Sequence, residues 1–282
     1  MKFFSTFILC LSFATTYAQS PIVTKDAAPY TREYKPVTGI LGAFDEEIKY
    51  LLTLVSNKTE KIIQQVKFTE GDINGHKVVV AQTGIGKVNA AITTTLMIEH
   101  FMPREIIFTG IAGGTNPVLS PGDIVIGQQV AYHDYGTQTA DSLMRRPTRN
   151  PFTMRENPVF YPGDVRLVNI ALKASAQAKF QKLKTSSGER HPNIISGVIV
   201  TGDVFVASTP AVTELRTELK ADATEMEGAA VAQTCSQQSQ PLVVVRSLSD
   251  NAGTAASSEV AQFYQLAARN SATLVVAMVS LL

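Results

Sequence analysis

The spacing of hydrophobic positions changes several times along the chain and predicts an alternation of strands and helices. Residues 45–55 repeat apolar side chains at helical spacing, whereas residues 242–245 form a short apolar run typical of a buried strand. The dipeptide Asn74-Gly75 separates two strand-like runs and is a strong signal for a two-residue hairpin. The predicted strands are 37–43, 61–68, 76–83, 105–109, 123–130, 194–201, 223–225 and 242–245. The predicted helices are 45–55, 87–101, 164–180, 210–219, 226–237 and 258–282.

This alternation predicts a single α/β domain over residues 37–282. Helices that alternate with strands cover both faces of a sheet, which gives a three-layer α/β/α sandwich. The hairpin at Asn74-Gly75 joins antiparallel strands, so the central sheet is expected to be mixed. Residues 136–163 hold four prolines and four arginines with little periodicity, and we expect them to form a long loop that is functional or mobile.

The first 18 residues have the features of a secretory signal peptide. Lys2 supplies the positive end, an apolar run follows, and Thr16-Tyr17-Ala18 offers small residues at the −3 and −1 positions of a cleavage site. The apolar run is too short to span a bilayer. We therefore expect an exported protein, periplasmic or secreted, with residues 19–36 as an N-terminal arm or linker. Removal of residues 1–18 would take away Cys10 and leave Cys235 as the one cysteine, which we expect to be a buried small side chain.

Charge and composition exclude several classes of function. The 282 residues include 25 Lys and Arg against 24 Asp and Glu, which leaves no electrostatic footprint for nucleic acid or an anionic membrane. A hydrophobic fraction of 45% excludes wholesale disorder. The four histidines are scattered and no cysteine pair has zinc-ligand spacing, so we expect no metal site.

A glycine-rich segment, Gly84-Ile85-Gly86-Lys87-Val88-Asn89, lies between a predicted strand and a predicted helix. Backbone N–H groups at such a helix start can bind an anion. However, Asn89 stands where the third glycine of a dinucleotide fingerprint belongs, so an oxidoreductase would rest on a partial motif. The segment alone is better explained as a tight turn, and we expect no cofactor.

Acids and glycines gather at the predicted ends of four strands. Glu46 and Glu47 follow the first strand, and Gly113, Glu227 and Asp250 follow three others. A carboxylate at a helix start also stabilises the helix dipole, but four such strand ends are hard to explain as independent caps. Ligands of open α/β sheets bind beyond the carboxyl ends of the strands. The sequence therefore predicts a ligand site at this edge.

Eight segments resemble, in order, the 5′-methylthioadenosine/S-adenosylhomocysteine nucleosidases, which belong to the purine nucleoside phosphorylase superfamily. The similarity runs from about residue 37 to the C-terminus, and its last two segments together are the most specific part. It implies hydrolysis of the N-glycosidic bond of 5′-methylthioadenosine, S-adenosylhomocysteine or a related adenine nucleoside, without a cofactor. The segments are 39–47, 84–90, 109–114, 121–125, 132–134, 201–205, 225–230 and 246–250.

The resemblance implies catalytic roles for the acids. Asp250 is the general acid that protonates the imidazole ring of the leaving adenine, while the sugar passes through an oxocarbenium-like transition state. Asp250 must then hold a proton near neutral pH, which burial favours. Glu47 is the base that activates the attacking water, and Glu227 grips the ribose hydroxyls.

The resemblance also implies the remaining substrate contacts. Phe205 stacks on adenine, the backbone of Val206 reads the edge of the base, and Met226 packs on the ribose. Arg246 and Ser249 position Asp250 and Glu47. The other expected substrate-binding residues are Phe44, Ile111, Ala112, Gly113 and Glu225.

Two alternatives to hydrolysis stay open. The resemblance also implies that two copies of the chain form a dimer. A phosphorylase would bind phosphate, but residues 43–47 carry three acids and no arginine, which favours water. A catalytically weak secreted nucleoside-binding or storage-like protein is kept open by Ile111, which stands where the family has a small polar residue. Because the family's 5′ pocket borrows residues from a second subunit, we expect a homodimer in which residues 131–163 approach the partner's pocket.

Overall fold

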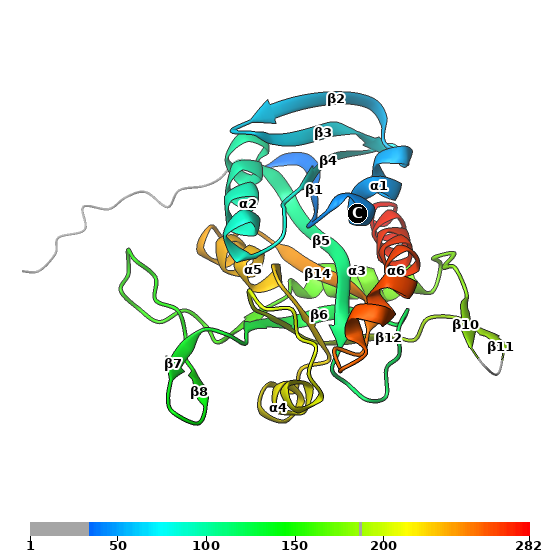
Figure 1. The fold of residues 1–282 in the computed structure, drawn as a ribbon. Coiled ribbons are helices and arrows are strands. Elements are labelled where there is room, and N and C mark those ends of the chain that lie inside the picture. The colour runs from blue at the N-terminus through cyan, green and yellow to red at the C-terminus, as the bar shows by residue number, and fades with distance from the viewer. Residues whose placement is uncertain (1–33, 186–187) are drawn as a thin grey trace, which may run out of the picture. The chain divides into compact units, whose positions relative to one another are not determined.

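A ten-stranded sheet forms the centre of the computed structural model, which describes residues 34–185 and 188–282 (Figure 1). Strand β9 (Phe160–Pro162) pairs with β6 beside the main path of the sheet. Along that path the strands follow one another in the order β13 (Ala223–Glu225), β12 (Ile194–Thr201), β6 (Ile124–Tyr132), β14 (Leu242–Asp250), β5 (Pro103–Gly114), β1 (Lys35–Gly42), β4 (His76–Gln82), β3 (Val66–Ile73) and β2 (Ser56–Ile63).

The sheet is mixed, as predicted, and one end of it closes on itself. Strand β1 runs parallel to both of its neighbours, β4 and β5, whereas β14 runs antiparallel to β6. The short strand β13 pairs with β12 on one side and with the last residues of β5 on the other, through Gly113 and Gly114. Strands β5, β14, β6, β12 and β13 therefore form a small closed barrel, which the sequence did not predict.

Helices cover both faces of the sheet, which confirms the three-layer prediction (Figure 1). Helix α4 (Thr209–Leu219) packs separately against β12. One face carries α1 (Asp45–Leu54), α3 (Val165–Ser175) and α6 (Ala256–Val279). The opposite face carries α2 (Lys87–Phe101) and α5 (Gly228–Gln237).

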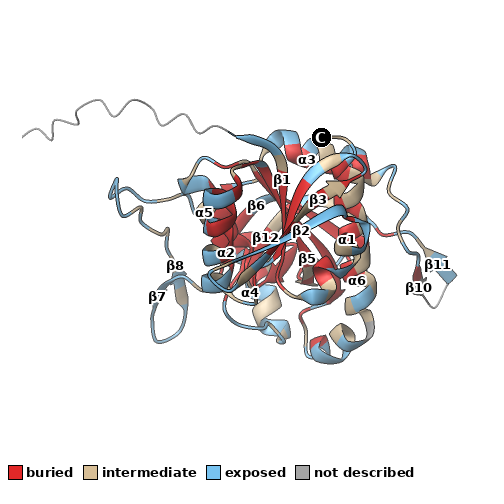
Figure 2. Ribbon diagram, turned by 90° about the horizontal axis from the view of Figure 1, so that it is seen from above, coloured by how far each residue is buried: buried red, intermediate tan, exposed pale blue. Residues whose placement is uncertain are grey.

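The central strands are buried on both faces, as Figure 2 shows. Successive residues alternate between two apolar cores: Ile40 packs toward α1 and α6, and Leu41 packs toward α2 and α5. Val243 and Val244 of β14 divide in the same way. This explains why these strands appear in the sequence as continuous apolar runs rather than alternating patterns.

Several predicted elements have the observed bounds, but one predicted strand is wrong. The helix over 87–101 and the strands over 194–201 and 223–225 are confirmed. The strand predicted over 61–68 crosses a hairpin turn at Gln64-Gln65, where φ is +46° and +68°. Glutamine is not a usual turn residue at positive φ, so the sequence carried no signal for this turn.

The hairpin predicted at Asn74-Gly75 is confirmed and joins β3 to β4, with φ of +51° and +83°. Several helix bounds differ from prediction: α3 ends at Ser175 rather than near residue 180, α5 starts at Gly228 rather than 226, and α6 spans Ala256–Val279 rather than 258–282. The bounds of α1 and α4 differ by one residue. The predicted strand over 242–245 continues to Asp250 as β14. Strand β5 likewise continues through all three glycines of 109–114, which are therefore strand residues rather than a sharp turn.

The stretch 136–163 is more structured than predicted. It contains a hairpin of β7 (Gly136–Gln138) and β8 (Leu143–Arg145), and it ends in β9. Arg145 anchors this hairpin, because its guanidinium pairs with Glu214 and Glu218 of α4. A second small hairpin, β10 (Leu183–Thr185) with β11 (Gly188–Arg190), was not predicted.

The N-terminal predictions lie outside the described residues. These are the signal peptide over residues 1–18 and the arm from residue 19 to residue 33. The last part of the predicted arm belongs to β1, which starts at Lys35. Cys235 is buried in α5, as expected. Among residues 34–185 and 188–282, no helix is long and apolar enough to cross a membrane.

Candidate active site

A cavity of about 260 Å³ opens where β1, β5, β13 and β14 end. It brings together most of the predicted site residues, although they come from distant parts of the chain. Ala43, Ile85, Thr224 and Val260 line it as well and were not among the predicted site residues. The predicted residues that line it are Phe44, Glu47, Ile111, Ala112, Gly113, Phe205, Glu225, Met226, Glu227, Ser249 and Asp250.

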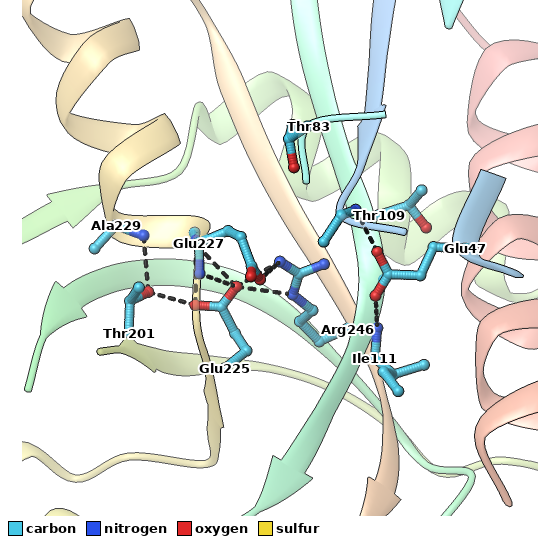
Figure 3. Close-up of polar contacts among 12 residues, drawn as sticks. Glu47, Thr83, Thr109, Ile111, Thr201, Glu225, Glu227, Ala229 and Arg246 are labelled. Carbon is cyan, nitrogen blue, oxygen red and sulfur yellow. Dashed lines mark hydrogen bonds and ion pairs between the residues drawn. The ribbon is translucent and has the colours of Figure 1, made fainter. Parts of the chain in front are cut away.

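Glu47 is buried in the first turn of α1, directly after β1 ends. Its two carboxylate oxygens accept hydrogen bonds from the backbone N–H of Ala43, at 2.5 Å, and of Ile111, at 2.9 Å (Figure 3). Burial raises the pKa of this carboxyl, although Arg246 and the backbone hydrogen bonds oppose the rise. Two strand ends therefore hold Glu47 in one orientation and leave it a stronger base when it is ionised.

Glycines on β5 make the room in which the acids lie. A Cβ atom on Gly110 would lie 2.0 Å from Nη1 of Arg246 and 2.4 Å from Oε1 of Glu47. A Cβ atom on Gly113 would lie 3.0 Å from Oδ1 of Asp250. These glycines allow side chains of the protein itself to approach the strand closely, and neither of them has a positive φ.

Arg246 lies beneath the cavity and is completely buried. Its guanidinium donates to Glu225 through Nε, at 3.2 Å, and through Nη2, and it lies 3.7 Å from Oε2 of Glu227 (Figure 3). The guanidinium also stacks on Phe108, 4.1 Å from the ring centroid. Arg246 therefore contacts Glu225 and Glu227, which are not the two acids, Asp250 and Glu47, that it was expected to position.

The carboxylate oxygens of Glu225 are occupied by groups of the protein. They accept from the hydroxyl of Thr201, from the N–H of Gly228, at 2.8 and 3.0 Å, and from the N–H of Glu227, at 3.3 Å. Arg246 completes this set. Glu225 lines the cavity, but its hydrogen bonds point to the start of α5, so it acts as an anchor for that helix start.

Glu227, by contrast, has one fixed oxygen and one facing Arg246. Oε1 accepts the backbone N–H of Gly86, at 2.8 Å. Burial and the nearby Glu225 raise the pKa of Glu227 to about 8, against the opposing effect of Arg246. Two backbone N–H groups at the start of α2 thus donate to acids of this chain. The N–H of Gly86 donates to Glu227, and the N–H of Lys87 donates to Asp203, at 2.8 Å. The 84–89 segment is a tight turn whose N–H groups serve the site.

Asp250 ends β14, is buried and lines the cavity. Its Oδ2 accepts from the hydroxyl of Ser249, at 2.7 Å, and its Oδ1 accepts from the N–H of Ala252, at 2.6 Å. Burial raises the pKa of Asp250 above its usual range, although these two hydrogen bonds lower it. Ser249 is therefore placed as expected, in direct contact with the acid.

The apolar side chains form the walls and the mouth of the cavity. Phe205 is 54% exposed and Ile85 is 56% exposed, so the mouth is open to solvent. Val206 lines a smaller cavity of about 30 Å³ that shares Phe205 and Asp250 with the larger one. Ile85 could have been found in the sequence, because it is an apolar residue inside a polar turn. Thr224 and Ala43 carried no signal of their own.

The charges of the site are unbalanced. Within the described part of the chain, Arg246 is the one cation that forms an ion pair with any of these acids, through Glu225 and Glu227. Glu47, Glu225, Glu227 and Asp250 are all buried around the cavity. Four ionised carboxylates beside one guanidinium would be costly in a buried site, so protonation of one or more of them follows. Among the described residues, no group of His, Cys, Asp and Glu side chains is arranged to hold a metal ion.

Comparisons with known proteins agree with this geometry. Residues 37–280 match the family model of the phosphorylase superfamily. The chain is 37% identical over 238 residues to a 5′-methylthioadenosine/S-adenosylhomocysteine nucleosidase of Psychromonas ingrahamii, which covers 84% of this chain and 95% of the relative.

Two solved structures show the same fold. One is a 5′-methylthioadenosine/S-adenosylhomocysteine nucleosidase of Colwellia psychrerythraea in complex with adenine, with a TM-score of 0.75, 32% identity, and coverage of 88% of this chain and 97% of the other. The second is a futalosine hydrolase of Helicobacter pylori, with a TM-score of 0.75, 32% identity, and coverage of 87% and 98%. The chain therefore belongs to the phosphorylase superfamily and, within it, to the 5′-methylthioadenosine/S-adenosylhomocysteine nucleosidase family.

Proposed function

We propose that this protein hydrolyses the N-glycosidic bond of 5′-methylthioadenosine, S-adenosylhomocysteine or a related adenine nucleoside, releasing adenine and the free sugar. The observation that carries this proposal is the meeting of three buried carboxyl groups, Glu47, Glu227 and Asp250, around one cavity. The names of the relatives, and the adenine bound to one of them, support the choice of substrate.

Asp250 acts as the general acid in this proposal. Adenine leaves readily only when a ring nitrogen is protonated, and the raised pKa of Asp250 keeps a proton available to a bound base. The hydrogen bond from Ala252 fixes Oδ1, so Oδ2, which Ser249 contacts, is the oxygen that delivers the proton. Phe205 lies between the two cavities, where its ring can stack on the purine.

Glu47 acts as the base that takes a proton from the attacking water. Its carboxylate is held by two backbone N–H groups at the floor of the cavity, next to Ile111. Glu227, whose Oε1 is held by the N–H of Gly86, forms hydrogen bonds with the ribose hydroxyls and orients the sugar. Met226 packs against the same sugar.

The lining of the cavity favours water over phosphate as the nucleophile. None of the described residues that line it is Lys or Arg, and Arg246 is engaged with Glu225 below it. Glu47, which acts as an ionised base in this proposal, would also repel a phosphate dianion. A phosphorylase therefore has less support than a hydrolase. The intact set of Glu47, Glu227 and Asp250 argues against a nucleoside-binding protein without turnover.

Product analysis tests the reaction directly. The purified protein is incubated with 5′-methylthioadenosine, adenosine, inosine and futalosine, with and without phosphate, and base and sugar are separated by chromatography. We expect adenine and free sugar from 5′-methylthioadenosine without phosphate. Sugar phosphate that forms only when phosphate is present would identify a phosphorylase instead, and protection from heat without cleavage would identify a binding protein.

Asp250→Asn is expected to bind substrate but to lower kcat by about 10²–10⁴-fold, because the amide cannot deliver a proton. Asp72→Asn is a suitable control, since Asp72 lies on the β3–β4 hairpin and pairs with Lys77. Steady-state kinetics of the two variants give the comparison. A kcat of Asp250→Asn equal to that of the unsubstituted protein would refute the assignment.

Glu227→Gln is expected to change how stability depends on pH. The folded protein holds a proton on Glu227 up to a pKa of about 8, whereas the unfolded chain releases it near 4.5, so rising pH between these values favours unfolding. The glutamine variant has no such proton to release. As the pH rises from 5 to 8, its free energy of unfolding should therefore gain on the order of 1–3 kcal/mol relative to that of the unsubstituted protein. Urea unfolding at both pH values measures the gain, and Glu60→Gln, at an exposed site, should show none.

We further infer that the protein is exported and acts as a homodimer, with residues 131–163 near the partner's pocket. The signal-like first 18 residues support export. The exposed Phe205 and Ile85 at the cavity mouth support a second subunit, since a neighbouring chain would cover them. Analytical ultracentrifugation should give twice the mass of one chain; a fully active monomer would contradict the dimer.

A further inference from the structure

Three charged residues outside the cavity form a cluster that the proposed chemistry does not use. Lys87 begins α2, Asp134 follows β6, and Asp203 follows β12. The ammonium group of Lys87 lies 2.7 Å from both carboxylate oxygens of Asp134 and 3.6 Å from Oδ2 of Asp203. We call these three residues the Lys87 cluster.

The cluster is partly shielded from water. The Lys87 side chain is only 22% exposed and that of Asp134 is 20% exposed. Nζ of Lys87 also lies 5.5 Å from the centroid of the Tyr132 ring, a favourable place for a cation. Ion pairs in such partly buried sites are screened by salt much less than pairs on the open surface.

Backbone hydrogen bonds extend the cluster into the loop that carries Phe205 and Val206. The N–H of Asp203 donates to Oδ2 of Asp134, at 2.8 Å, and the N–H of Lys87 donates to Oδ1 of Asp203, at 2.8 Å. The loop from 202 to 208 has no helix or strand of its own, and Val204 and Phe205 are more than half exposed. Packing within one chain therefore does little to fix the position of the Phe205 ring.

The same turn also fixes the acid assigned to the ribose. Gly86, next to Lys87, donates its N–H to Oε1 of Glu227. Gly86 has φ of +94°, which glycine adopts without strain, and a Cβ atom there would lie 3.3 Å from Oδ1 of Asp203. One turn thus holds both the group that would grip the sugar and the loop that would stack on the base.

We propose that Lys87 is a positioning residue for recognition of the purine base, which holds the loop of Phe205 and Val206 against the cavity through Asp134 and Asp203. This inference rests on the proposed function, because it takes Phe205 as the base-stacking residue. Without the cation, the carboxylates of Asp134 and Asp203 would face each other with no positive charge between them, and the Asp203 side chain would be held by the backbone N–H of Lys87 alone. The acids Asp250 and Glu47 lie on other elements and would keep their places.

The test replaces Lys87 by methionine, which keeps the length of the side chain and removes its charge. We expect Lys87→Met to raise KM for 5′-methylthioadenosine about tenfold, a change of ~1.4 kcal/mol, and to leave kcat within about threefold. Lys87→Arg keeps the charge and should restore most of the loss. Lys77→Met is the matched control, because Lys77 pairs with Asp72 at 2.9 Å but is 66% exposed and lies on β4.

A fluorescent reporter follows the loop without catalysis. The chain has no tryptophan, so Ala207→Trp places a single tryptophan on this exposed loop. In this background Lys87→Met should shift the emission and weaken binding of free adenine by about the same tenfold factor as KM. The Lys77→Met control should do neither.

The outcomes separate this inference from the proposed function. If the unsubstituted protein cleaves no nucleoside but binds adenine, the proposed reaction fails and the adenine titration still tests the Lys87 cluster. Adenine affinity and KM that are unchanged in Lys87→Met would overturn the inference, as would a fall in kcat at constant KM. A protein that binds no adenine at all would overturn both.

Discussion

The placement of one buried positive charge among four buried carboxyl groups is the constraint on which the site depends. Arg246 is fully buried, stacks on Phe108 and binds Glu225 directly. Water therefore does not screen its positive charge. One guanidinium cannot neutralise four carboxylates, and burial raises the pKa of Glu47, Glu227 and Asp250. Burial is therefore the main cause that favours the protonated form of these three carboxyl groups, and Glu225 adds to it at Glu227. In the proposed reaction, a protonated carboxyl is what an adenine leaving group requires.

The acids divide according to how many of their oxygens the protein occupies. Glu225 accepts hydrogen bonds from Thr201, from the start of α5 and from Arg246, which leaves it an anchor. The other three carboxyl groups are each oriented by one or two contacts and face the cavity. Glu225 thus anchors the wall of the cavity, and the other three acids are already oriented toward the cavity before a ligand binds.

Closure of the sheet explains how residues so distant in sequence meet. Strand β13 pairs with both β12 and the end of β5, and this brings Glu225, Gly113 and the end of β14 to one small region. The glycines of β5 then permit an approach that any side chain would block, as the position of Gly110 beside Glu47 and Arg246 shows. The barrel and the glycines are parts of one arrangement, since a closed sheet with larger residues here would have no room for the acids.

The sequence by itself determined the α/β class, the Asn74-Gly75 hairpin, the helix over 87–101 and the gathering of acids at strand ends, because apolar spacing and turn residues act locally. Eleven predicted site residues line the cavity. Glu47, Gly113, Glu227 and Asp250 were expected there because the carboxyl ends of the strands share one edge, whereas the other seven came from the resemblance to the nucleosidase family. Only the tertiary structure decided the turn at Gln64-Gln65, the barrel closure and the use of the glycines in 109–114, because none of these leaves a local pattern. It also decided the hydrogen-bond partners of Glu225 and Lys87, because a partner far away in the chain cannot be read from the residues beside it.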